Sequence, residues 1–159
     1  ANRPAMPEEI QEMRRLARQA MHDGAWGMST GLIYVPGSYA DTDELRAIAE
    51  VIAEEGGIYA SHMRDEGTEM LAALEELLQV GQRAQLPVHV SHFKSSGQDA
   101  WGLIRQAAKR IERAREEGQQ VTAGAAIRTA RHRRSIPLHR FQYVAGGDGA
   151  PHVGSGRRP

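Results

Sequence analysis

The sequence predicts a parallel α/β fold, because short apolar strands alternate with amphipathic helices. Strands are expected at 24–35, 57–63 and 87–93 and from 119 onward, with starts roughly thirty residues apart, as in successive βα units. Two architectures share this pattern, an open doubly wound sheet and a closed (β/α)8 barrel. A closed barrel typically needs about 250 residues. The 159-residue chain is therefore expected to form a small open sheet or half of a barrel.

Four helices with an apolar stripe are expected between these strands. The first begins at Pro7, with acidic residues in its first turn, and ends near Asp23-Gly24. The second is capped by Asp41 or Thr42 and ends near Gly56-Gly57. The other two are predicted at 69–84 and 101–117.

Composition narrows the class of protein. The chain is 25% charged and 40% hydrophobic, as in an ordinary soluble domain. It has no apolar run of about 18 residues and does not start with a secretion signal, so we expect a cytoplasmic protein without a membrane partner. Cysteine is absent, so any metal ligands here are nitrogen or oxygen atoms.

Two histidines stand near the carboxyl ends of neighbouring predicted strands, where parallel α/β folds place their chemistry. They are His62 in YASHMRDEG (59–67) and His92 in VHVSHFKSSG (88–97). Side chains alternate along a strand, so Lys94 is expected on the face of His92 and His89 on the opposite face. Histidines at equivalent positions of adjacent strands can reach one point, and neutral imidazole is a preferred zinc ligand. The pattern therefore predicts a metal site.

A purely structural interpretation competes with this one. A histidine at the end of a strand is commonly a hydrogen-bonded polar group. We also interpret His89, on the opposite face, and His22, near a helix end, as structural. The acidic and basic residues at 64–66 have the pattern of a solvated loop or of a cap for the next helix.

Three segments, GAWGMSTGLIYVPGSYADTDEL, GGIYASHMRDEG and PVHVSHFKSSG, resemble the N-acyl-D-amino-acid deacylases (D-aminoacylases) of the amidohydrolase superfamily. The resemblance covers about residues 7–123 and implies a partial (β/α)8 TIM barrel, at about its fourth to seventh strands. It implies that His62 and His92 bind Zn²⁺ and that Lys94 binds the substrate carboxylate. Tyr34, in the loop 32–37, is a candidate to line the acyl pocket. The implied reaction is hydrolysis of a small N-acyl-D-amino acid to a D-amino acid and a carboxylate.

The chain departs from the family pattern in three ways. It has no His-x-His pair, no cysteine ligand and no counterpart of the catalytic aspartate on the last strand. We therefore expect this chain to supply half of a metal site, with the catalytic aspartate outside it, to bind zinc weakly and to be inactive alone.

The charge balance changes abruptly near the end. Residues 1–120 contain 13 Lys and Arg against 19 Asp and Glu, whereas residues 121–159 contain 7 against 1. We interpret 1–123 as the partial barrel and 124–159, which is rich in arginine and glycine, as a disordered or frame-shifted tail. Two alternative functions remain: a hydantoinase-like or dihydroorotase-like amidohydrolase, and a non-catalytic module that binds nucleic acid through the basic tail.

Overall fold

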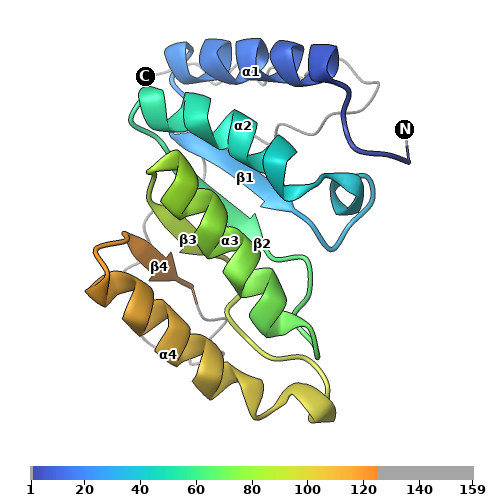
Figure 1. Cartoon of the computed structure of the whole chain (residues 1–159), viewed down its shortest axis with the longest axis vertical. Coiled ribbons are helices and arrows are strands. Elements are labelled where there is room, and N and C mark those ends of the chain that lie inside the picture. Colours follow the sequence, from blue (N-terminus) through green and yellow to red (C-terminus); the bar gives the residue numbers. More distant parts are fainter. Residues whose placement is uncertain (1, 125–159) are drawn as a thin grey trace, which may run out of the picture.

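Four parallel strands alternate with four α-helices in the computed structural model, which describes residues 2–124 (Figure 1). Every predicted strand and helix is present, and two short 3-10 helices precede α2 and α4. The elements are α1 (Pro7–His22), β1 (Gly27–Gly31), η1 (Gly37–Tyr39), α2 (Thr42–Glu54), β2 (Ile58–His62), α3 (Met70–Ala84), β3 (Val88–Val90), η2 (Gln98–Ala100), α4 (Leu103–Glu116) and β4 (Val121–Ala123).

The order of the strands decides between the two predicted architectures. The strands pair in sequence order, β1-β2-β3-β4, and all pairs are parallel. Figure 1 shows the four helices over one face of the sheet, and each helix packs on the next one along the chain. Right-handed crossovers that always step in one direction put every helix on the same side, as in a barrel, whereas a doubly wound sheet carries helices on both sides. The fold is therefore a partial (β/α)8 barrel, and the open-sheet alternative is wrong.

Local sequence explains where the helices begin. Pro7 occupies the first turn of α1, and the Glu9 carboxylate accepts the free N–H of Met6 at 2.6 Å. At α2 the side chain of Asp41 accepts the N–H of Glu44 at 2.8 Å, as the predicted N-cap requires.

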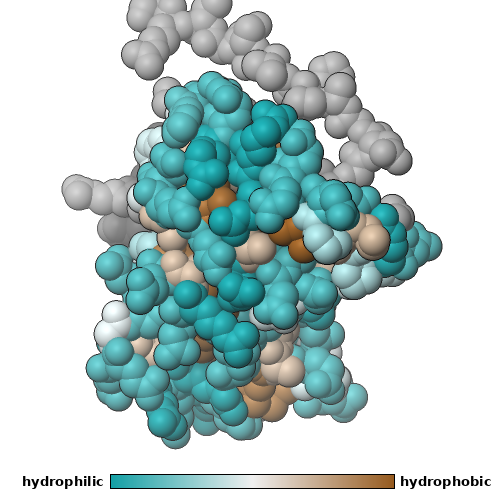
Figure 2. All heavy atoms as spheres, turned by 45° about the horizontal axis from the view of Figure 1, so that its top comes forward, coloured by the Kyte–Doolittle hydropathy of each residue, from teal (hydrophilic) through white to brown (hydrophobic). Residues whose placement is uncertain are grey.

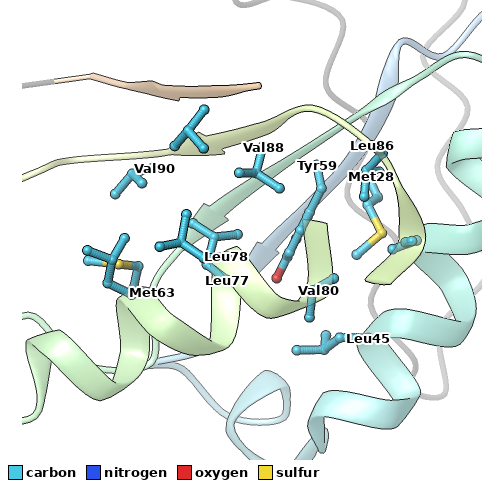
Figure 3. Packing of buried hydrophobic residues seen from close by; sticks show 14 of the residues in the cluster. Met28, Leu45, Tyr59, Met63, Leu77, Leu78, Val80, Leu86, Val88 and Val90 are labelled. Atoms are coloured by element: carbon cyan, nitrogen blue, oxygen red, sulfur yellow. The ribbon is translucent and has the colours of Figure 1, made fainter. Parts of the chain in front are cut away.

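The hydrophobic core lies between the sheet and the helices (Figure 3). Met28, Tyr59 and Val88 occupy one row across β1, β2 and β3, because each is paired with its neighbour in the register. All three are at most 3% exposed. Residues from α2 and α3 pack against this row from the helix side, among them Leu45 and Leu77. The sheet is therefore held by its helix-covered face, which leaves the other face to carry polar groups.

The outer surface is mainly hydrophilic in the view of Figure 2, with hydrophobic side chains visible in small patches. Within the part of the chain that the structure describes, no helix is long and apolar enough to cross a bilayer. The predicted tail, apart from Gly124, lies outside the described residues, so its assignment stays a prediction.

Gly27 is expected to be the most sensitive position for the β1–β2 pairing. A Cβ added there would overlap the carbonyl oxygen of Ile58 and lie 2.7 Å from its nitrogen. Since backbone atoms cannot move aside without breaking the ladder, Gly27→Ala should lower the free energy of unfolding by about 3 kcal/mol, the upper end for overpacking. Urea denaturation of the 159-residue chain measures this.

Gly102→Ala is the matched control. Gly102 has a right-handed backbone, and no atom lies within 4 Å of an added Cβ. The free energy of unfolding of Gly102→Ala should stay near that of the wild type. Equal unfolding midpoints for Gly27→Ala and Gly102→Ala would contradict the described register.

Candidate metal and substrate site

The two predicted metal ligands lie side by side at the carboxyl ends of β2 and β3. His62 is the last residue of β2, and His92 lies two residues beyond the end of β3. Their ring centroids are 5.1 Å apart, with the planes inclined at 61°. Two imidazoles at this separation can direct nitrogen atoms toward one point.

The reason for this proximity differs from the predicted one. In the register, Ala60 pairs with His89 and Ser61 with Val90. Paired residues of parallel strands point to the same side, so His62 shares its face with His89. The expectation that His89 points to the opposite face is therefore wrong, and His62 and His92 do not occupy equivalent positions.

A turn after β3 brings His92 to the site instead. Its backbone is left-handed, with φ of 54°, a conformation uncommon for a residue other than glycine. The next residue, Phe93, donates its N–H to the carbonyl of Gly124 at 2.8 Å, which fixes the chain after the turn against β4. Residues held in this conformation by their surroundings concentrate at functional sites. His89 itself is bonded through Nδ1 to the Thr122 hydroxyl at 2.8 Å, which agrees with its structural interpretation.

Glu66 lies between His62 and Lys94. One carboxylate oxygen, Oε2, accepts from Nζ of Lys94, and the other, Oε1, is 3.4 Å from Nε2 of His62. That second contact is within ion-pair range but too long for a good hydrogen bond, so Oε1 is a buried oxygen without a hydrogen-bond partner. Glu66 is only 6% exposed. The sequence pattern, which placed it in a solvated loop, missed this residue.

The other two charged residues of this segment are also engaged. Asp65 accepts the N–H groups of Gly67 and Glu69 at 2.6 and 3.1 Å, both in the loop before α3. Arg64 forms two bonds of 2.9 Å to Glu76. Asp65 therefore stabilises the loop rather than the first turn of α3, which has no side-chain cap bond at its N-cap Glu69, and Arg64 belongs to an ion pair rather than to solvent.

Arg64 also fixes the loop that carries Tyr34. Its guanidinium donates to the carbonyls of Ser38 and Ala40 at 2.9 and 2.8 Å, in the segment between β1 and α2. The Tyr34 ring stands 5.2 Å from the ring of His62 and is 60% exposed. All four residues singled out from the sequence, Tyr34, His62, His92 and Lys94, therefore lie at one end of the sheet.

The electrostatics favour a neutral His62. Burial lowers its pKa below the ordinary value; the carboxylate of Glu66 opposes this shift, and the charges of His92 and Lys94 add to it. Neutral imidazole is the form that binds a metal. With Nε2 facing Glu66, Nδ1 is the nitrogen of His62 left for a ligand bond.

The donor atoms that this chain brings together are of the kind that zinc binds. Two neutral imidazoles are borderline-soft nitrogen donors of the type that zinc prefers, and the unsatisfied oxygen of Glu66 provides negative charge beside them. Among residues 2–124 there is no cluster of three or more His, Asp or Glu arranged to hold a metal ion. These residues therefore fit two positions of a zinc site.

The chain is similar in sequence to known proteins over most of its length. No family model matches the chain. D-aminoacylase from Alcaligenes xylosoxydans xylosoxydans is 40% identical over 144 residues, which cover 91% of this chain and 26% of that protein. N-acyl-D-glutamate deacylase from the same organism is 39% identical over 114 residues, covering 72% of this chain and 23% of the relative.

Solved structures give the same result. A crystal structure of D-aminoacylase, described as defining a novel subset of amidohydrolases, superposes with a TM-score of 0.75 at 39% identity, over 78% of this chain and 26% of that chain. The N-acyl-D-glutamate deacylase of Bordetella bronchiseptica, complexed with zinc and a phosphonate inhibitor, has a TM-score of 0.75 at 37% identity, over 77% and 26%. L-Hydantoinase from Arthrobacter aurescens, at 20% identity and a TM-score of 0.51, shares the fold.

The fold of this chain matches a segment of the amidohydrolase barrel seen in these structures. Within that class the chain is a relative of the N-acyl-D-amino-acid deacylases, as the sequence motifs predicted. It spans about a quarter of the length of the relatives it matches.

Proposed function

We propose that this chain is the part of a zinc-dependent N-acyl-D-amino-acid deacylase that contributes two metal ligands and the lysine that binds the substrate carboxylate. The observation that carries the proposal is the approach of His62 and His92 to 5.1 Å, with Lys94 held beside them by Glu66. Relatives named D-aminoacylase and N-acyl-D-glutamate deacylase support the reaction class. A cytoplasmic location belongs to the same proposal.

Each side chain has a distinct task in this proposal. Bound zinc supplies Lewis-acid activation of water and of the amide carbonyl at neutral pH. His62 and His92 hold the ion through neutral nitrogens. Lys94, whose side chain is 42% exposed, can bind the carboxylate of an amino acid as a point charge. Tyr34 lines the acyl side, because its ring is exposed next to His62.

A hybrid enzyme tests the proposal. Residues 2–124 replace the matching quarter of the Alcaligenes D-aminoacylase, so that the remaining ligands and the general base come from the relative. This hybrid barrel is expected to hydrolyse N-acetyl-D-methionine in a zinc-dependent manner, whereas the 159-residue chain alone should show no turnover. A folded hybrid that binds zinc but hydrolyses no N-acyl-D-amino acid would contradict the proposal.

The hydantoinase-like alternative is tested with the same protein. L-Hydantoinase shares the fold with this chain, but the relatives that this sequence matches are deacylases. Hydrolysis of a hydantoin in preference to N-acetyl-D-methionine would favour it. The nucleic-acid module depends on residues outside the described part of the chain and stays a prediction.

A further inference from the structure

The burial of Glu66 requires an explanation that ion pairing alone does not give. A carboxylate loses its hydration when it is buried, and the loss is offset only when its oxygens are bonded. Glu66 is 6% exposed, yet only Oε2 has a hydrogen-bonding partner, the ammonium of Lys94. Oε1 faces Nε2 of His62 at 3.4 Å without a bond. A purely structural pair with Lys94 would not need the second oxygen directed at a histidine.

The backbone fixes Glu66 in this position independently of its side chain. Its carbonyl accepts the N–H of Ser96 at 2.7 Å, which ties the loop after β2 to the loop after β3. On the other side of the same turn, Asp65 accepts the N–H of Gly67. The carboxylate is therefore presented to both His62 and Lys94 by a loop that other contacts hold in place.

Without Glu66, the ammonium of Lys94 would repel a cation bound by the two histidines. Lys94 places an ammonium next to two histidines that suit a divalent cation, and like charges at short range repel strongly where water is excluded. A carboxylate between them cancels this repulsion and attracts both cations. The same carboxylate, set against one ring nitrogen of His62, favours the tautomer in which the other nitrogen is free to bind a metal.

We propose that Glu66 is a positioning residue that lets a substrate-binding lysine and a metal-binding histidine pair share one site, by neutralising Lys94 and orienting His62. This inference rests on the proposed zinc-binding function. It gives Glu66 a role toward the metal without making it a ligand.

Zinc affinity in four variants of the 159-residue chain tests this role. The variants are Glu66→Gln, Lys94→Ala, the double variant of both, and the control Glu50→Gln. Glutamine preserves the size of residue 66 but not its charge. Glu50 on α2 forms ion pairs with Arg14 of α1 and Arg46 of α2. Glu50→Gln therefore removes a paired carboxylate that is not part of the site. Affinity is measured by competition with a chromophoric chelator, after thermal unfolding has shown that each variant folds.

The expected pattern is specific to charge neutralisation. Glu66→Gln should weaken zinc binding about tenfold or more, the usual effect of losing an outer-shell carboxylate. The double variant should recover most of this loss, because the uncompensated ammonium is then gone. Glu50→Gln should bind as the wild type does.

Two results would overturn the inference. One is wild-type zinc affinity in Glu66→Gln, and the other is a double variant that binds as weakly as Glu66→Gln. Failure of the proposed function has a different signature, which is a folded hybrid barrel whose zinc content does not depend on His62.

Discussion

His62→Ala and His92→Ala are each expected to remove zinc from the hybrid barrel and to abolish its activity. The two rings approach to 5.1 Å at the ends of adjacent strands, so each can offer one nitrogen to a common metal ion. Zinc provides several kcal/mol of transition-state stabilisation, so its loss should lower kcat/KM by about a thousandfold or more. Metal analysis after gel filtration and an assay with N-acetyl-D-methionine measure both effects.

His22→Ala provides the control for these variants. His22 ends α1, and its nearest charged partner is Glu55, at 3.3 Å and away from the strand ends. Its loss should change neither metal content nor turnover. Full zinc occupancy with either His62 or His92 removed would show that the ligands are assigned wrongly.

Lys94→Ala is expected to leave the zinc in place and to act mainly on KM. Its ammonium bonds to Glu66 rather than to either histidine, and its side chain is 42% exposed. It can therefore reach an incoming carboxylate, a contact made equally in the ground and transition states. A hydrogen bond to a charged group contributes about 1.5–3 kcal/mol, so KM should rise roughly 10- to 100-fold with little change in kcat.

A substrate without the carboxylate shows whether Lys94→Ala loses a substrate contact or disturbs the fold of the hybrid barrel. N-acetyl-D-methioninamide has a neutral amide in place of the carboxylate that Lys94 would contact. The wild-type hybrid and Lys94→Ala should therefore hydrolyse its acetyl group with similar kcat/KM. Zinc lost together with Lys94 would instead place this lysine in the support of the metal site.

The four βα units could be predicted because their signals are local. Helical periodicity and caps such as Asp41 depend on residues a few positions apart, and the predicted helices agree with α1–α4 within a few residues. Strand β1 is shorter than the predicted segment, because the chain turns after Gly31 into the loop that leads to η1. Apolar residues continue through 32–35 and made the strand look longer than it is.

The sequence singled out the candidate residues of the site but did not predict how they come together. Alternation of side chains holds only inside a strand, and β3 ends at Val90, so it could not place His92, whose left-handed turn depends on the loop after β3. The register that aligns His89 with Ala60 is likewise a long-range property. Glu66 escaped notice because a charged residue in a polar segment is ordinarily solvated, and its burial follows from two loops that meet only in the folded chain.

Zinc K-edge X-ray absorption tests most directly whether His62 and His92 hold one metal ion. The 159-residue chain is loaded with one equivalent of zinc and compared with the His62→Ala, His92→Ala and double variants. The wild type should show two imidazole nitrogens at about 2.0 Å from the zinc, and this pair should be lost in both single variants and in the double variant. An imidazole count that is unchanged in the double variant would contradict the account.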